Sequence, residues 1–316
     1  MKIGAGHLQI GALGFCLATC ACGGGGDHPA SASGTPVSAA PTYDSFASLN
    51  KNVTLLTSSA ASSFSYSTTS GPIPGSVSND AKGGFGDGAV TISYDAASQT
   101  YTVHDSSSAI SYAPADRDAS APGPSQSPFD TYVHRNGSVT DTISAYRVGT
   151  ANTQFPQLSY ATFAVARRET ATTVSGVSNA NITTRLIYAV GGFETQRSDL
   201  PKTGTASYST YVTGTAIESG AGRDVGGSAT ITADFGGASV NTTLALTSGG
   251  QSIGTFNGAA PIESTTPHFK GDLTANGATQ GSFSGSFFGP QAAEVGYTYR
   301  VQTSIGTVDG GAVGKK

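Results

Sequence analysis

The amino-acid sequence predicts an all-β protein that ends in an eight-stranded antiparallel up-and-down β-barrel. Helix-forming residues are scarce, whereas 43 glycines and many serines and threonines favour turns and extended segments. From Thr203 onward, small or apolar residues alternate with polar ones, which is the period of two that strands show. The 14 Phe and 13 Tyr residues provide apolar surface for a packed interior. We therefore expect short strands joined by tight turns.

The charge balance and the cysteine positions exclude two kinds of function. A formal net charge of −4 leaves no basic surface of the kind that a phosphate backbone requires, so we predict no nucleic-acid partner. All three cysteines, Cys16, Cys20 and Cys22, lie within the first 22 residues. The folded part can therefore hold neither a disulfide nor a thiolate metal site, and we predict no bound metal.

Residues 1–22 have the features of an export signal. A lysine at position 2 precedes an apolar stretch, Ile10 to Ala21, which is too short to cross a bilayer as a helix. Cys22 follows a small residue and precedes four glycines, an arrangement that resembles the lipobox of bacterial lipoproteins. That resemblance implies a lipoprotein signal peptide with Cys22 as the lipid attachment site, Cys20 being the alternative. An ordinary signal peptide that contains cysteines by chance remains open.

Residues 23–42 contain mostly Gly, Ala, Ser and Pro and hardly any large apolar side chain. This composition is typical of a flexible tether. A tether would hold the folded part away from the membrane, so we expect the working surface to face away from the lipid.

Eight successive segments make up the predicted barrel. The first runs from Thr203 and the eighth covers Gly306 to Lys316. The clearest is the sixth, in which Phe283, Gly285, Phe287 and Gly289 alternate with Ser282, Ser284, Ser286 and Phe288. A closed barrel removes the sheet edges that would otherwise promote aggregation. At about eight strands its interior is either filled by side chains or holds one small ligand, and the mixture of large and small inward residues favours filling.

The sixth and seventh segments also resemble a known family. The run from Gly281 to Gly296, together with a final Gly314-Lys315-Lys316 and the entry Leu200 to Tyr208, resembles the terminal barrel of the transferrin-binding protein B family of surface lipoproteins. The resemblance implies a structural barrel motif at Gly204, Phe287, Gly289, Pro290, Glu294, Gly296, Gly314 and Lys315. Within it, we expect Glu294 to fix the turn beside Pro290. The sequence departs from the family pattern at Tyr297 and at Ala312-Val313.

The residues before the barrel are similar to the handle domain of the same family. Leu158 to Phe163 and Arg185 to Gly192 resemble the two strands that lead from the handle into the barrel. Val90 to Val103 reads as a hairpin, and Tyr112 to Pro128 as a loop. We therefore predict one lobe, with an antiparallel handle-like domain at 43–199 and the barrel at 200–316. Members of the family with two lobes are longer.

The sequence contains no recognisable catalytic constellation, so we predict that the protein is not an enzyme. His104, His134 and His268 are the histidines beyond the tether, and one of them could bind haem iron. Surface histidines are the simpler interpretation, and we expect no cofactor. Arg167, Arg168, Arg197 and Arg223 are candidate anchor points for a protein partner, because arginine is enriched in binding hot spots.

The sequence as a whole thus predicts a lipid-anchored protein of the outer membrane, exposed at the cell surface. Its ligand would be an iron-related or haem-related protein, or another solute, bound by loops of the handle and the barrel. Two alternatives stay open. One is a carrier of haem or another small ligand, within the barrel or at its mouth, and the other is a structural envelope lipoprotein without a specific ligand.

Overall fold

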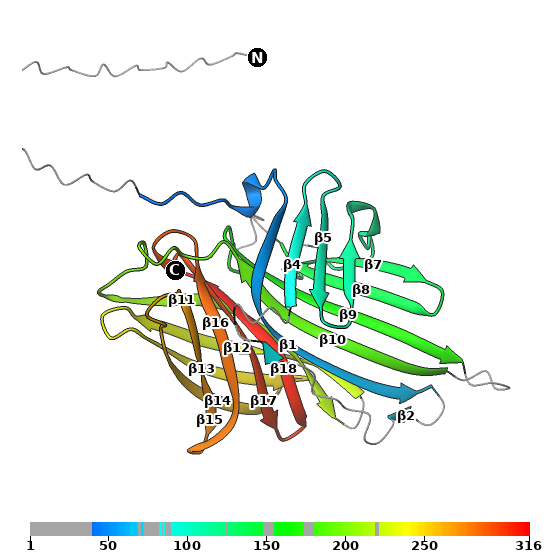
Figure 1. The fold of residues 1–316 in the computed structure, drawn as a ribbon. Coiled ribbons are helices and arrows are strands. Elements are labelled where there is room, and N and C mark those ends of the chain that lie inside the picture. The colour runs from blue at the N-terminus through cyan, green and yellow to red at the C-terminus, as the bar shows by residue number, and fades with distance from the viewer. Residues whose placement is uncertain are drawn as a thin grey trace, which may run out of the picture. The chain divides into compact units, whose positions relative to one another are not determined.

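The chain folds almost entirely into antiparallel β-strands, which form two sheets (Figure 1). The computed structural model describes residues 40–68, 71–72, 82–83, 85, 90–123, 125–147, 155–173, 180–218 and 221–316. Residues 40–316 form one compact unit. The signal peptide, both candidate anchor cysteines and residues 23–39 of the tether lie outside the described residues.

The first sheet, which we call the handle, has the strand order β6-β5-β4-β1-β10-β9-β8-β7, and two short strands, β2 and β3, add to β1. Its strands are β1 (Val53–Ser67), β2 (Gly71–Pro72), β3 (Lys82–Gly83), β4 (Val90–Asp95), β5 (Thr100–Asp105), β6 (Ala109–Tyr112), β7 (Phe129–Asn136), β8 (Val139–Tyr146), β9 (Ala161–Thr173) and β10 (Ala180–Gly192). The predicted hairpin is β4 and β5. Of the two predicted lead-in strands, Arg185 to Gly192 lies in β10, whereas Leu158 to Phe163 overlaps β9 only from Ala161 onward.

The handle sheet curls until its two edge strands, β6 and β7, meet. The rings of Tyr112 on β6 and Tyr132 on β7 stack with their centroids 4.2 Å apart. The Arg168 guanidinium on β9 also donates to the carbonyl oxygen of Ala109, at 3.1 Å. Side-chain contacts therefore bring together edges that would otherwise be open, and the sheet is nearly closed.

The second sheet is a closed barrel of eight strands, β11 to β18, each hydrogen-bonded to the next and β18 to β11. These strands are β11 (Thr205–Glu218), β12 (Ala221–Asp234), β13 (Ser239–Ser248), β14 (Gln251–Pro261), β15 (His268–Ala275), β16 (Ala278–Phe288), β17 (Glu294–Thr303) and β18 (Gly306–Lys315). The predicted fold class, an all-β chain that ends in an eight-stranded antiparallel barrel, is confirmed.

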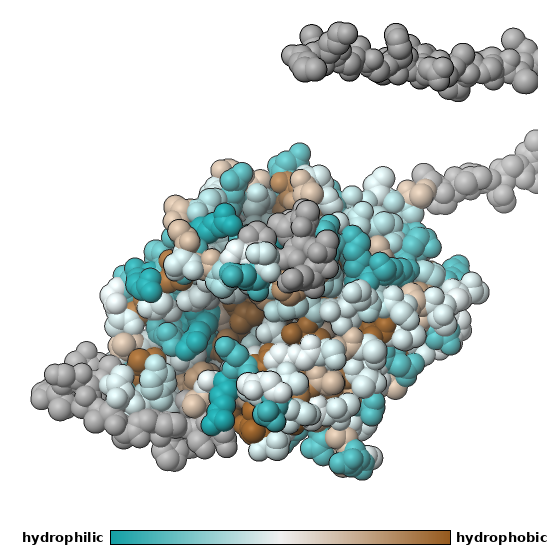
Figure 2. Space-filling model, turned by 180° about the vertical axis from the view of Figure 1, so that it is seen from behind, coloured by the Kyte–Doolittle hydropathy of each residue, from teal (hydrophilic) through white to brown (hydrophobic). Residues whose placement is uncertain are grey.

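The described helices are three short 3-10 turns: η1 (Phe46–Ser48), η2 (Pro114–Asp116) and η3 (Pro290–Ala292). Among the described residues, no helix has the length and apolar character to cross a membrane. On the face shown in Figure 2, apolar side chains come to the surface mainly in recesses between polar ones.

Candidate functional site

The interior of the barrel is filled by aromatic side chains. Phe283 and Phe287 on β16 both contact Phe269 on β15, with ring centroids 6.1 and 5.4 Å apart. Tyr297 and Tyr299 on β17 are fully buried beside them, and burial raises the pKa of both phenols above the ordinary range. The hydroxyl of Tyr297 is hydrogen-bonded to that of Thr242 at 2.9 Å. Because side chains occupy this interior, we expect a binding site on the outside of the barrel.

The handle packs against the outer wall of the barrel. Phe163 and Val190 of the handle share one buried apolar cluster with Phe288 and Val313 of the barrel. Two glycines of the predicted motif lie at this seam and permit the close approach. A Cβ atom on Gly289, which has φ +70°, would lie 2.3 Å from Cδ2 of Tyr160, and one on Gly296 would lie 2.6 Å from Cγ1 of Val190.

Glu294 joins the two sheets at the same seam. Its carboxylate oxygens accept hydrogen bonds from the backbone amides of Ser159, Tyr160 and Ala161, at 2.7, 2.9 and 2.8 Å. Burial raises the pKa of this carboxyl, and the three amides oppose the rise. We predicted that Glu294 fixes the turn beside Pro290. Its carboxylate instead holds the start of strand β9, because the handle chain passes directly over it.

A second buried polar contact lies further along the seam. The Asp309 carboxylate on β18 accepts from Nε and Nη2 of Arg300, at 2.6 and 2.8 Å, and from the hydroxyl of Ser62 on β1. Arg300 also donates to the carbonyl oxygen of Ala61, at 2.6 Å. This network fixes the handle strand β1 on the barrel.

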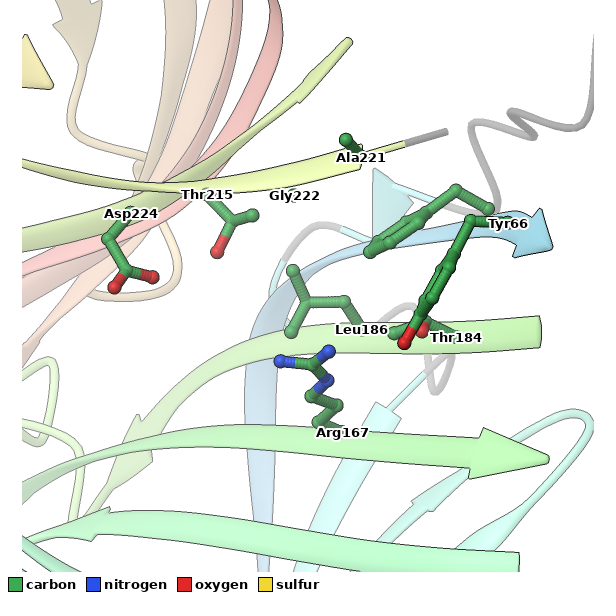
Figure 3. Close-up of a pocket in the computed structure, with 9 residues that line it drawn as sticks. Tyr66, Arg167, Thr184, Leu186, Thr215, Ala221, Gly222 and Asp224 are labelled. Carbon is green, nitrogen blue, oxygen red and sulfur yellow. The ribbon is translucent and has the colours of Figure 1, made fainter. Parts of the chain in front are cut away.

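Beyond these contacts a cleft lies between the handle and the barrel, and we call it the junction cleft (Figure 3). It has a volume of about 310 Å³. The handle wall is formed by strands β1, β9 and β10, and the barrel wall by β11 and β12. The lining residues are Phe64, Tyr66, Arg167, Thr184, Leu186, Thr215, Ala221, Gly222 and Asp224.

Strand alternation explains why these side chains share one face. Phe64 on β1 is the register partner of Thr184 on β10, and Leu186 on β10 is the partner of Arg167 on β9. Residues opposite each other in a sheet project from the same side. In Figure 3 the side chains of Arg167 and Tyr66 extend from the handle into the space below Thr215 and Ala221 of the barrel.

The junction cleft has an apolar floor and a charged rim. Phe64 and Leu186 are buried, and Tyr66 is partly exposed. Arg167 is 48% exposed, and its guanidinium pairs with Glu169 at 2.6 Å. Asp224 is exposed, and its carboxylate makes no ion pair with any residue that the structure describes. Such a site can bind a ligand that has an apolar part and a charge.

The remaining motif residues lie at the ends of barrel strands or in its core. Lys315 belongs to the seam, since its ammonium group donates to the carbonyl oxygen of Gln157 at 2.8 Å. Of the others, Gly204 precedes β11, Phe287 is buried on β16, Pro290 begins η3, and Gly314 lies near the end of β18. None of the eight motif residues lines the junction cleft.

The candidate arginines do not form one cluster. Arg167 lines the cleft, and Arg223 is adjacent in sequence to two residues that line it. Arg168 forms an ion pair with Asp141 at 2.7 Å, and Arg197 donates to the carbonyl oxygen of Ser264 at 2.8 Å. Sequence reasoning missed the aromatic floor of the cleft, although the alternation of Phe64 and Tyr66 was a signal for it.

The three histidines lie apart and outside the cleft. His104 contacts the hydroxyl of Ser93 at 3.1 Å, and His134 lies 3.6 Å from Asp116. His268 is mostly buried, at 2.9 Å from the carboxylate of Glu194. Within the described ranges, no group of three or more His, Cys, Asp or Glu side chains could hold a metal ion.

Comparisons with known proteins agree with the geometry of the barrel. A family model described as the C-lobe and N-lobe beta barrels of Tf-binding protein B matches residues 200–315. The predicted resemblance to transferrin-binding protein B is confirmed, and this part of the chain is similar to the barrels of that protein. A search of the curated proteins finds no match.

Solved structures of the same kind align over most of the chain. Intact Ap-TbpB, with its N and C lobes, is 14% identical, with 84% of this chain and 77% of that one covered and a TM-score of 0.42. The vaccine antigen transferrin binding protein B of Haemophilus parasuis Hp5, in a double mutant, is 14% identical, with 84% and 76% covered and a TM-score of 0.37. The isotype 1 protein of serogroup B Neisseria meningitidis is 10% identical, with 84% and 77% covered and a TM-score of 0.32. The assignment of the barrel rests on the family model and not on these structures.

Proposed function

We propose that this chain, which carries a barrel of the transferrin-binding protein B type, is a lipid-anchored protein of the outer-membrane surface that binds an iron-related or haem-related protein at the junction cleft. The observation that carries the proposal is the cleft itself, an apolar floor with a charged rim on the outside of a filled barrel. Binding hot spots have this anatomy, with desolvated apolar residues at the centre and polar residues around them.

Two further features support a receptor rather than a carrier or an enzyme. The aromatic filling of the barrel favours an external ligand over one enclosed in the barrel. The described residues that line the cleft include an arginine, an aspartate and two threonines, but no histidine or cysteine. A protein partner therefore fits the cleft better than a reacting substrate does, and we propose that the protein is not an enzyme.

Biolayer interferometry with the full chain in mild detergent tests the binding. Because the matching family model is named for transferrin binding, transferrin is the first analyte and haemoglobin the second. We expect saturable binding of one of them, and Ala221→Trp, which fills the mouth of the cleft, should weaken it by about tenfold or more. Ala278→Trp, at an exposed residue of β16 outside the cleft, is the control and should bind normally. Equal binding by the two variants would exclude the cleft as the site, and no binding of either analyte would exclude this class of partner.

Labelling with radioactive palmitate tests the anchor and the location. We expect Cys22→Ser to abolish incorporation of label and Cys20→Ser to leave it intact, because a lipobox acylates a single cysteine. Because we propose that the protein is exposed at the cell surface, we expect protease added to whole cells to degrade it. If the Cys22→Ser variant still incorporates label and the Cys20→Ser variant does not, Cys20 is the acylated residue. Resistance to protease in intact cells would contradict surface exposure.

A further inference from the structure

The junction cleft has a size that suits one large side chain and its neighbour. Its volume of about 310 Å³ is at the lower end of the range of roughly 300–1,000 Å³ that ligand pockets span. Phe64, Tyr66 and Leu186 supply apolar surface on one wall, and barrel residues close the other (Figure 3). Aromatic side chains bind well in such places because they bury a large area with few rotatable bonds.

A buried hydroxyl in the handle wall lacks a partner. Thr184 is 0% exposed, and its Oγ1 atom makes no hydrogen bond with any described residue. Leaving a buried hydroxyl without a partner costs about 1–3 kcal/mol, so its presence calls for an explanation. Thr184 also lines the junction cleft, and an oxygen atom carried by the ligand can supply the missing partner once the side chains over the hydroxyl give way.

The rim of the cleft carries one carboxylate without an ion pair among the described residues. The guanidinium of Arg167 is already held by Glu169, whereas the carboxylate of Asp224 has no ion pair within the described part of the chain. A cation beside Asp224 would gain a charge-assisted contact, and an anion there would be repelled.

We infer that the junction cleft receives a tyrosyl side chain that is followed by a basic residue, both presented by the protein partner. The ring packs against Phe64, Tyr66 and Leu186, its phenol oxygen meets the hydroxyl of Thr184, and the neighbouring cation lies beside Asp224. The inference rests on the proposed function and names the part of the partner that the cleft recognises.

Three dipeptides serve as probes: N-acetyl-tyrosyl-lysine amide, N-acetyl-phenylalanyl-lysine amide and N-acetyl-tyrosyl-glutamate amide. Their dissociation constants for the full chain in mild detergent are measured by ligand-observed NMR titration in the millimolar range. We expect the tyrosyl-lysine probe to bind about three- to tenfold more tightly than either of the others, since one hydrogen bond or one ion contact contributes about that much.

The variant Thr184→Val tests the hydroxyl contact. It keeps the shape of the side chain, and we expect it to bring the two lysine probes to equal affinity without weakening the fold, because the hydroxyl it removes has no partner in the free protein. Ser59→Ala is the matched control, since Ser59 carries the other buried hydroxyl without a described partner and does not line the cleft. That variant should keep the preference for tyrosine.

The variant Asp224→Asn tests the charge. It should remove the preference for lysine over glutamate, whereas Asp272→Asn, at an exposed carboxylate on β15 outside the cleft, should retain it. Equal binding of all probes to the wild type, absence of binding, or preferences that survive Thr184→Val and Asp224→Asn would overturn the inference.

These outcomes are separable from those of the proposed function. Protein binding that Ala221→Trp weakens, together with dipeptides that bind without preference, would refute only the tyrosyl-basic ligand. Dipeptides that bind as expected, together with no binding of transferrin or haemoglobin, would refute only the class of partner.

Discussion

Gly289 illustrates how a single residue of the barrel motif is determined by the handle. Its backbone has φ +70°, and the ring of Tyr160 lies where a side chain would be. Any side chain at this position would meet both a strained backbone and a steric clash with the handle. The sequence motif therefore reflects packing between two sheets rather than the turn that surrounds it.

We predict that Gly289→Ala lowers the free energy of unfolding by about 2–4 kcal/mol, measured by urea denaturation followed by circular dichroism. Gly277→Ala is the matched control, because Gly277 has φ +79° with open space around the position of a Cβ atom. Gly277→Ala would therefore introduce backbone strain without a steric clash and should lower the free energy of unfolding by about 1 kcal/mol. Similar losses in the two variants would mean that the contact with Tyr160 is unimportant.

Strand β1 shows at the scale of the element why sequence periodicity found some strands and missed others. Barrel strands away from the handle, such as β13, alternate buried and exposed residues, and β16 shows the same alternation in its residue types although the handle buries both of its faces. In β1, by contrast, the segment from Thr57 to Ser62 is buried on both faces, between the handle core and the barrel. Small residues fill both faces, so no alternation marks the strand.

The carboxylate of Asp105 connects the turn between β5 and β6 to strand β10. Asp105 accepts hydrogen bonds from the Arg185 guanidinium on β10 and from the amides of Ser107 and Ser108. Burial opposes ionisation of Asp105, but Arg185 and the two amides outweigh it and hold the pKa of this carboxyl below its usual range.

We predict an acid-labile contribution to stability from Asp105. A carboxyl with a lowered pKa in the folded state stabilises the fold above its ordinary pKa, which is about 3.9, and this contribution is lost as the pH falls through the folded-state value. Urea midpoints measured from pH 6 down to pH 2 should therefore fall less steeply for Asp105→Asn than for the wild type. Asp224→Asn, at an exposed carboxylate without a described ion pair, should follow the wild-type curve. An unchanged slope for Asp105→Asn would contradict the prediction.

At the scale of the whole molecule, buried polar contacts make the handle and the barrel one unit. Glu294 and Asp309 are both fully buried, and each accepts hydrogen bonds from the opposite sheet. Burying a charged group costs free energy unless its hydrogen-bond partners are all in place. We therefore expect little movement of the handle relative to the barrel at the seam. One wall of the junction cleft belongs to the handle and the other to the barrel, so we expect the cleft to be rigid as well.

We predict that the wild-type protein unfolds in one calorimetric transition and that Asp309→Ala destabilises it by about 3–5 kcal/mol, because Arg300 would then be left buried without its carboxylate. The handle should melt before the barrel in this variant, so that two transitions appear in differential scanning calorimetry. Asp272→Ala, at an exposed carboxylate, should behave as the wild type does. Two transitions in the wild type would show that the seam does not couple the sheets.

The fold class and the barrel strands could be predicted from the amino-acid sequence, because alternation and turn residues are local properties of a strand. The motif between Gly281 and Gly296 indicated the resemblance to transferrin-binding protein B. The sequence also indicated Arg167 as a possible anchor. The contact of Glu294 with the handle, and the cleft that Phe64, Thr184 and Asp224 share, could not be predicted in this way. These residues come from strands far apart in the chain, and the angle between two sheets, rather than any local pattern, brings them together.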